Sequence, residues 1–234
     1  PMTVWHWPLS ADYNRYQLTE KDAHYLDSLR TVSFLVIRSD SIVFENYRDG
    51  WNDTLTSNIY SATKTIVGLL AGIALDEGKI HSLDDPVSRY IPAYTKGMQA
   101  DVTLRHLLTM SGGMAWDEAY ASLFSVTTHG YYGNDLYDLV TGLEVVDRPG
   151  VQYSYRSGET QLLAFCHRGS HWANTKRLCR REALASDAAE RDAYWLLDKK
   201  TVTKSLLLTF HTTGRDVSPF RKSTLFTSWQ LAGP

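Results

Sequence analysis

Residues 61–77 read SATKTIVGLLAGIALDE, and this run is the strongest structural signal in the chain. Its central ten residues, 66–75, are apolar on nearly every face, and the run is too long for a single strand. A helix that is apolar all round belongs inside a protein core. We therefore predict a central, buried helix over residues 61–77.

The first turn of that helix carries Ser61 and Lys64, three positions apart. This spacing places both on one helical face, where an amine can take the proton of a serine hydroxyl and activate it as a nucleophile. The positive end of the helix favours negative charge at Ser61, and burial favours a neutral amine that can accept a proton. Taken alone, the four residues could equally be an ordinary helix start with a surface lysine. Because an ionised lysine at the mouth of so apolar a helix is costly, the context favours the catalytic interpretation.

The segments around this helix predict a mixed α/β (α+β) fold. Residues 31–38 and 41–47 are β-branched runs separated by two residues, a pattern typical of a hairpin in an antiparallel sheet. We expect that sheet to be flanked by helices and accompanied by a helical region over about residues 80–150. The site is then expected in the cleft between them.

Several shorter helices are also predicted. One covers residues 20–29, and another covers residues 103–110 and is stopped by the Ser-Gly-Gly turn at residues 111–113. The pattern up to residue 144 is mixed helix and loop. A last helix starts after Gly158, with Glu159 near its start and Leu162 and Leu163 on its buried face.

The composition is that of one ordinary soluble domain over residues 1–234. The chain is 43% hydrophobic and 21% charged with a formal net charge of -2, so neither nucleic acid nor an anionic membrane is an expected partner. No apolar run approaches the roughly 20 residues of a membrane span, and the N-terminus lacks the pattern of a signal peptide. The compartment, cytoplasmic or periplasmic, and the oligomeric state stay open.

No cofactor is predicted from the sequence. The chain has no HExxH, P-loop or GxGxxG motif, so neither a metal nor a nucleotide is expected. Cys166 and Cys179 have no metal-ligand or redox spacing, and we interpret them as incidental thiols.

Further segments share their order and spacing with one known group of proteins. They are residues 59–64 (IYSATK), 74–80 (ALDEGKI), 83–87 (LDDPV), 102–113 (VTLRHLLTMSGG), 149–150 (PG) and 155–157 (YRS). Over roughly residues 30–165 the chain resembles the superfamily of serine β-lactamases, penicillin-binding D-alanyl-D-alanine peptidases and related esterases. Such an ordered set is far more specific than one motif. The resemblance implies a β-lactamase/transpeptidase-like fold in which Ser61 is the nucleophile and Lys64 its base.

The resemblance also implies a second motif, Y-x-N, whose tyrosine passes a proton to the leaving group. Tyr153 and Tyr155 are both candidates. The spacing from residues 149–150 to the apolar pair at residues 162–163 favours Tyr155 and leaves Tyr153 in a structural position. Ser157 then stands where the family usually has asparagine, which makes it a candidate substrate-binding residue.

A Y-x-S version of the motif resembles the branch that includes 6-aminohexanoate-dimer hydrolases and related esterases. It implies small-molecule or peptide-like linear amides or esters as substrates, in preference to β-lactams. In that branch a tyrosine on the loop after the Ser-Gly-Gly turn touches the substrate amide. Residues 116–120 (WDEAY) are similar, which nominates Tyr120 as substrate-binding; a packed surface aromatic is the alternative.

Three further polar residues have structural interpretations. His106 lies in the helix before the Ser-Gly-Gly turn, and since Lys64 already supplies a base, we expect His106 to be a structural hydrogen-bonding group. Asp84 and Asp85 precede Pro86 and are expected to cap a turn, not to form an acid/base pair.

The family's third motif, K-T-G or H-x-G on a strand near the C-terminus, is not found in this sequence. Residues 211–214 (HTTG) are similar to it, but with residues 215–217 they look like a segment that introduces a helix well before that strand. They are given no catalytic role. We expect the chain to end before the strands that complete the sheet and one wall of the site.

Residues 166–188 are rich in Cys, His, Arg and Trp and have no regular period. Codons allowed for most of this segment, read one nucleotide later, yield a family-like helix and connection. We therefore hypothesise a frameshift over residues 166–188, with parts of 201–210 and 219–234 also affected. The predicted function is a serine hydrolase that acts on an amide or ester through an acyl-enzyme on Ser61. The alternative is a non-catalytic or inactive homologue.

Overall fold

The computed structural model describes residues 6–166, 194–195 and 210–217. The described residues divide into two compact units: an N-terminal unit of residues 6–58, 194 and 211–217, and a helical unit of residues 59–166, 195 and 210. The single domain expected over residues 1–234 stays a prediction. Cys179 and, apart from Cys166 and residue 210, the segments of the frameshift hypothesis lie outside the described residues.

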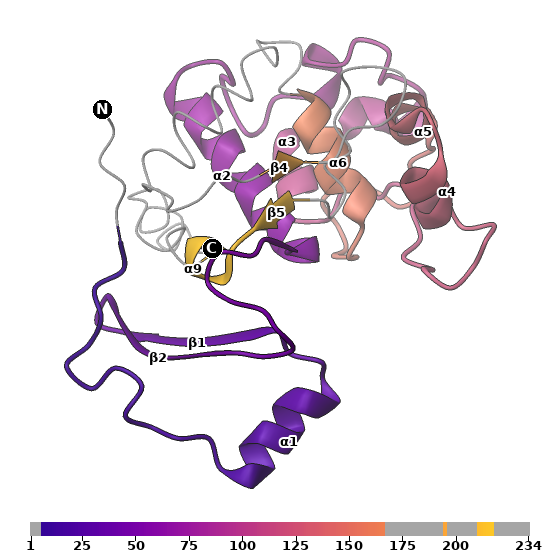
Figure 1. Cartoon of the computed structure of the whole chain (residues 1–234). Coiled ribbons are helices and arrows are strands. Elements are labelled where there is room, and N and C mark those ends of the chain that lie inside the picture. The colour runs from indigo at the N-terminus through magenta and orange to yellow at the C-terminus, as the bar shows by residue number, and fades with distance from the viewer. Residues whose placement is uncertain (1–5, 167–193, 196–209, 218–234) are drawn as a thin grey trace. The chain divides into compact units, whose positions relative to one another are not determined.

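The N-terminal unit contains the hairpin that the sequence predicts (Figure 1). β1 (Ser33–Arg38) and β2 (Ser41–Tyr47) pair antiparallel, with one irregularity in the register. Ser39 and Asp40 form the connection and have φ values of 48° and 58°. Left-handed backbone at both central residues matches the twist of paired strands, which explains why two residues suffice for the turn.

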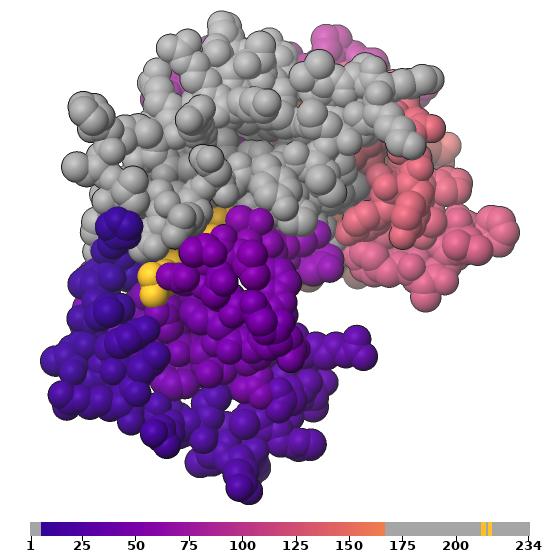
Figure 2. Space-filling view, in the orientation of Figure 1, coloured from indigo at the N-terminus to yellow at the C-terminus, as the bar shows by residue number. Residues whose placement is uncertain are grey.

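Two segments that precede the hairpin complete this part of the unit. α1 (Glu20–Ser28) confirms the predicted helix and begins with a capping box between Thr19 and Asp22. Further upstream the chain runs along β2, because Ser10 N–H donates to the Ile42 carbonyl at 2.9 Å. Figure 2 shows the atoms of this first segment (indigo) beside those of the hairpin (purple).

A second, smaller sheet has the strand order β3-β5-β4. β3 (Ser57–Asn58) pairs antiparallel with β5 (Phe210–Thr212), and β4 (Tyr194–Trp195) is the other neighbour of β5. α9 (Gly214–Val217) follows β5 directly. The expectation that residues 211–214 introduce a helix is thus confirmed.

A buried ion pair ties the two ends of the N-terminal unit together. The Glu45 carboxylate on β2 is 6% exposed and accepts hydrogen bonds from Arg215 on α9 at 3.0 Å, from Tyr13 at 2.6 Å and from Tyr47 at 3.0 Å. Burial alone would raise the pKa of Glu45, but the hydrogen bonds from Arg215, Tyr13 and Tyr47 hold it below its usual value. The carboxylate is therefore fully compensated, as a buried charge requires.

The helical unit is a cluster of helices around α6, which contacts α2, α3 and α5 (Figure 1). Its elements are η1 (Tyr60–Ala62), α2 (Thr63–Asp76), η2 (Val87–Arg89), η3 (Gly97–Asp101), α3 (Leu104–Leu108), α4 (Val126–Tyr132), α5 (Leu136–Gly142) and α6 (Ser157–Cys166). Leu162 and Leu163 on α6 are 0% and 1% exposed, as the sequence predicts. Burying one such side chain contributes about 2 kcal/mol, so α6 is the centre of this core.

The central apolar helix differs from the prediction at its start. The sequence predicts one helix from Ser61, whereas α2 begins at Thr63 and Ser61 lies in the 3-10 turn η1 before it. The reason is local: Ala62 N–H donates to the Ile59 carbonyl at 3.1 Å, so residues 60–62 close a 3-10 turn, which includes Tyr60 with its φ of 45°, before α-helical pairing begins.

Candidate active site

Ser61 is presented at the start of the helical unit by this sharp turn. The left-handed conformation of Tyr60 costs a non-glycine residue roughly 1–2 kcal/mol. The turn leaves Ser61 exposed, and it also leaves the Tyr60 ring 63% exposed beside it. Strained backbone that the surroundings hold in place gathers at functional sites. The geometry therefore makes Ser61 accessible to a ligand.

Lys64 lies on the first turn of α2, on the same side as Ser61. Its Nζ donates a hydrogen bond to Ser61 Oγ at 3.3 Å. The sequence leads one to expect a buried amine, but Lys64 is only half-buried. The expectation of burial was wrong because the first turn of α2 is open beside Ser61: Ala62 and Thr65 are exposed, and the buried residues of the helix other than Thr63 lie between Ile66 and Ala74.

Tyr155 reaches the same oxygen from a distant part of the sequence. Its Oη donates to Ser61 Oγ at 2.8 Å, and its ring centre lies 5.0 Å from Lys64 Nζ. Of the two tyrosines that the motif leaves open, Tyr155 is the one that contacts Ser61, while Tyr153 is 67% exposed. Two groups able to exchange protons, the Lys64 amine and the Tyr155 phenol, thus converge on the hydroxyl oxygen of Ser61.

The segment that carries Tyr155 is held by the loop after α3. Ser154 N–H donates to the Met110 carbonyl at 2.9 Å, and Gly150 N–H donates to the Ser111 carbonyl at 2.9 Å. These backbone bonds fix the segment one residue before Tyr155. The Ser-Gly-Gly turn therefore acts as a support for the tyrosine.

Ser157 is placed differently from the expectation that it touches substrate. It is 1% exposed, and its hydroxyl donates to Glu118 Oε2 at 3.1 Å while its N–H donates to Glu118 Oε1. A direct contact between the Ser157 hydroxyl and a substrate would require this hydrogen bond to open.

Glu118 is a site residue that sequence reasoning missed. Besides the two Ser157 groups, its carboxylate accepts a hydrogen bond from Trp116 Nε1 at 3.0 Å and one from the Tyr120 hydroxyl. Four donors on two oxygens lock the loop that carries Tyr120 to the start of α6. Glu118 and Ser157 are 39 positions apart, so no local spacing could have linked them.

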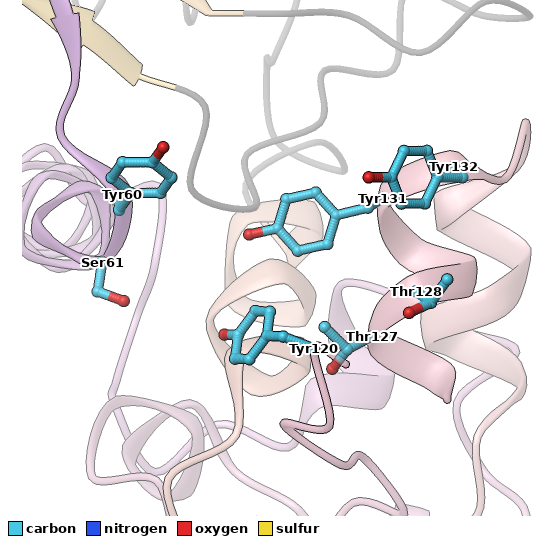
Figure 3. Close-up of a pocket in the computed structure, with 7 residues that line it drawn as sticks. All are labelled: Tyr60, Ser61, Tyr120, Thr127, Thr128, Tyr131 and Tyr132. Atoms are coloured by element: carbon cyan, nitrogen blue, oxygen red, sulfur yellow. The ribbon is translucent and has the colours of Figure 1, made fainter. Parts of the chain in front are cut away.

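A pocket of about 420 Å³ opens beside Ser61. It is lined by Tyr60, Ser61, Tyr120, Thr127, Thr128, Tyr131 and Tyr132, which we call the tyrosine pocket (Figure 3). Figure 3 shows the hydroxyls of Tyr120 and Tyr131 pointing toward the side where Ser61 lies. The predicted Tyr120 therefore borders the same space as the serine hydroxyl.

Tyr120 and Tyr131 keep their phenol protons at neutral pH. Burial, and then the hydrogen bond to Glu118, raises the pKa of Tyr120 to about 12. Burial also raises the pKa of Tyr131 well above its usual range. Both side chains are consequently neutral in the pocket.

The buried carboxylate of Glu159 supports the Ser-Gly-Gly turn. Glu159 on α6 is 0% exposed and accepts from Gly112 N–H at 3.0 Å and Met114 N–H at 3.4 Å. Burial raises the pKa of Glu159. A Cβ on Gly112 would lie 3.1 Å from the Glu159 carboxyl carbon, which explains the glycine at this position.

The other polar residues singled out in the sequence have structural contacts. His106 Nδ1 accepts from Thr103 N–H at 3.2 Å within the cap of α3, as a structural role requires. Asp85 accepts from Ser82 N–H in the turn before Pro86, as expected. Asp84 does more than the prediction states, because both its oxygens accept hydrogen bonds from Arg105, at 2.7 and 2.9 Å.

Within residues 6–166, 194–195 and 210–217, no cluster of His, Cys, Asp or Glu has the makings of a metal site. The same part of the chain contains no helix whose length and apolar character would suit a membrane span.

Comparison with known proteins agrees with these features. A family model described as Beta-lactamase matches residues 19–185. A 6-aminohexanoate-dimer hydrolase from Paenarthrobacter ureafaciens is 26% identical over 151 residues, which are 60% of this chain and 38% of that protein. Protein flp from Staphylococcus aureus is 28% identical over 143 residues, 56% of this chain and 28% of its own length. The chain thus spans well under half of these curated relatives.

Solved structures show the same fold. A Bacillus anthracis protein assigned as a candidate 6-aminohexanoate-dimer hydrolase matches with a TM-score of 0.74 at 21% identity, over 85% of this chain and 55% of that one. The octameric penicillin-binding protein homologue from Pyrococcus abyssi matches with a TM-score of 0.63 at 18% identity, over 85% and 53%. These likenesses confirm the fold class expected from the sequence.

Proposed function

Because this chain belongs to the beta-lactamase family, we propose that it hydrolyses an amide or ester through an acyl-enzyme on Ser61. One observation carries the proposal. The Oγ of Ser61 lies 3.3 Å from Nζ of Lys64 and 2.8 Å from Oη of Tyr155. Both are hydrogen-bond distances, so either group can exchange a proton with the serine hydroxyl directly.

Acylation uses both partners. Lys64 takes the hydroxyl proton of Ser61 while Oγ bonds to the carbonyl carbon of the substrate. The bond from that carbon to the leaving nitrogen or oxygen then breaks, and Tyr155 donates its proton to the departing atom. The Tyr155 phenolate regains a proton from protonated Lys64, whose Nζ lies 5.0 Å from the ring centre.

Deacylation repeats the chemistry with water as the nucleophile. Lys64 accepts a proton from the water, the acid is released and Ser61 regains its hydrogen. The Ser61 N–H is the expected first donor to the oxyanion, and loss of one such donor typically costs about a hundred- to a thousandfold in rate. The second donor is expected from the strand of the third motif.

The proposed substrates are linear amides or esters. The name of the Paenarthrobacter ureafaciens relative points to hydrolysis of a 6-aminohexanoate dimer. For this chain we propose only the general class, a linear amide or ester. Tyr120, which borders the tyrosine pocket, is the proposed contact for the substrate.

Intact-mass spectrometry tests the proposal. The protein is incubated with a fluorophosphonate and with a panel of p-nitrophenyl esters, amides and β-lactams. One covalent adduct per chain is expected, and it should disappear in Ser61→Ala. Ser122→Ala, which removes another exposed serine hydroxyl, should label normally.

The rival function is a relative of the same fold that binds ligands without catalysis. If folded wild-type protein forms no adduct with any probe, or if Ser61→Ala labels as well as the wild type, the hydrolase proposal is wrong. Circular dichroism of each sample separates loss of reactivity from loss of folding.

A further inference from the structure

The tyrosine pocket has a wall of phenol rings. The ring centres of Tyr120 and Tyr131 are 6.2 Å apart at an interplanar angle of 59°, which makes them one continuous aromatic surface. Tyr60 and Tyr132, 63% and 85% exposed, border the same space (Figure 3). Rings in such tilted arrangements attract a further aromatic ring.

Three hydroxyl hydrogens of the pocket already form hydrogen bonds within the protein. The Tyr120 hydroxyl donates to Glu118, the Thr127 hydroxyl donates to the Asp117 carbonyl, and the Thr128 hydroxyl donates to the Ser122 carbonyl at 2.7 Å. A hydroxyl has only one hydrogen to donate. These three groups can therefore offer a ligand only acceptor oxygens and apolar surface.

Tyr131 differs from these three side chains. It is half-buried, its hydroxyl points toward the Ser61 side, and within the described part of the chain that hydroxyl has no hydrogen-bond partner (Figure 3). A half-buried phenol without a partner can donate one hydrogen bond to a ligand. One neutral donor suits a neutral acceptor such as an amide or ester carbonyl.

The electrostatic surroundings disfavour a negative ligand group. None of the seven lining residues is a cation, and the Glu118 carboxylate lies directly behind the Tyr120 hydroxyl. Lys64, the nearby amine, contacts Ser61 and Tyr155 and is not part of the lining. A carboxylate that enters the pocket would lose hydration without gaining a paired charge, which is strongly unfavourable.

We propose that the tyrosine pocket binds an uncharged, aryl-bearing group of the substrate, with Tyr131 as its specificity-determining residue, and excludes groups that carry a carboxylate. This inference rests on the proposed hydrolysis at Ser61, since it names the substrate class for that site. A volume of about 420 Å³ lies within the range of small-molecule pockets and has room for a phenyl ring on a short chain.

Equilibrium binding to the Ser61→Ala variant tests the proposal without requiring catalysis. Isothermal titration compares 4-phenylbutyramide, butyramide and glutaramate, which share an amide and differ in carrying a ring, nothing or a carboxylate. We expect 4-phenylbutyramide to bind about tenfold more tightly than butyramide, as two ring contacts predict. Glutaramate should bind no more tightly than butyramide. Equal or tighter binding of glutaramate than of 4-phenylbutyramide would overturn the proposal.

Substitutions at Tyr131 then locate the effect. In the Ser61→Ala background, Tyr131→Ala should remove most of the preference for the phenyl ligand, and Tyr131→Arg should shift the preference toward glutaramate. Tyr25→Ala removes an exposed tyrosine from α1, which is not part of the pocket, and should change neither affinity. A phenyl preference that survives Tyr131→Ala unchanged would assign the selectivity to another residue and contradict the proposal. If Tyr131→Ala does not fold, the affinities of the three amides for the Ser61→Ala variant with Tyr131 intact still test the proposed preference for an aryl group.

Kinetics with ethyl 4-phenylbutyrate, ethyl butyrate and monoethyl glutarate separate this proposal from the proposed function. If the wild type forms acyl-enzymes but shows no preference among the three esters, only the specificity is wrong. If no ester acylates Ser61 while the amide ranking holds in the binding assay, the pocket assignment stands and the hydrolase proposal fails.

Discussion

The hydroxyl of Tyr155 donates a 2.8 Å hydrogen bond to Oγ of Ser61, although 94 positions of sequence separate the two residues. Tyr155→Phe removes this hydroxyl and keeps the ring near Lys64. Because the proposed role is proton donation to the leaving group, we expect kcat/KM for alkyl esters and amides to fall about a hundred- to ten-thousandfold. p-Nitrophenyl esters, whose leaving group needs no proton, should lose much less. Equal losses for both substrate classes would contradict the assigned role.

Lys64→Met tests the proton acceptor. Methionine fills similar space on the half-buried first turn of α2, so we expect little change in the free energy of unfolding. The acylation rate should fall at least about a hundredfold, because Ser61 loses the amine 3.3 Å from its oxygen. Stopped-flow measurement of acylation checks the rate, and urea unfolding checks the stability. Retained acylation in a folded Lys64→Met protein would shift the base role to Tyr155.

Glu118 is expected to act as a positioning residue for Tyr120 and the start of α6. Glu118→Ala leaves four donors without their acceptor and should cost about 2–3 kcal/mol of stability together with most of the activity. Glu118→Gln keeps one acceptor oxygen for the two N–H donors, while both hydroxyls can rotate to accept from its amide. We therefore expect Glu118→Gln to restore most of the stability and kcat. Chemical unfolding and ester kinetics on the two variants give the comparison, and a glutamine variant as poor as the alanine variant would refute this role.

Tyr60 offers a test of the strained turn before the nucleophile. Glycine adopts a φ of 45° without strain, so Tyr60→Gly should be more stable than Tyr60→Ala by about 1 kcal/mol, even though glycine normally destabilises folded chains relative to alanine. Both variants remove the same exposed ring. Thermal unfolding of the pair measures the difference, and an alanine variant of equal or higher stability would show that the turn is not strained.

The buried pair of Glu45 and Arg215 predicts acid sensitivity of the N-terminal unit. The folded-state pKa of Glu45 lies below its unfolded value of about 4.5, so the carboxylate stabilises the fold above that pH, and this contribution is lost as the pH falls through the lower, folded-state value. Glu45→Gln should therefore be less stable than wild type at pH 7 and approach it near pH 3. Urea unfolding at the two pH values checks this. Glu144→Gln, at an exposed position, should show no such convergence.

Much of the fold could be predicted from local patterns. The apolar run of α2, the β-branched runs of the hairpin and the short helix after Thr103 are encoded in consecutive residues, and the structure has all three. The start of α2 could not be predicted, because it depends on the 3-10 turn at residues 60–62 and on the left-handed conformation of Tyr60 within it. The half-burial of Lys64 depends on which neighbours fill the space beside it, which a single sequence does not specify.

The candidate site also contains residues that the sequence could predict and residues that it could not. Ser61 and Lys64 are three residues apart, so helical spacing predicts their proximity. Tyr155 could be nominated only through the resemblance to a known family, and its hydrogen bond to Ser61 is a tertiary contact. Glu118 carried no signal, because a glutamate in a polar loop is common and its partner Ser157 lies 39 positions away.

The loop between Met110 and Glu118 sets the position of Tyr155 at both ends. Met110 accepts the backbone bond one residue before Tyr155, and Glu118 accepts the one two residues after it. The distance between the Tyr155 hydroxyl and Ser61 Oγ therefore depends on a loop that contains neither residue. Inserting or deleting one residue in this stretch would change the spacing of its two anchors and move the Tyr155 phenol away from Ser61. The proposed proton transfer therefore constrains the length of this short loop.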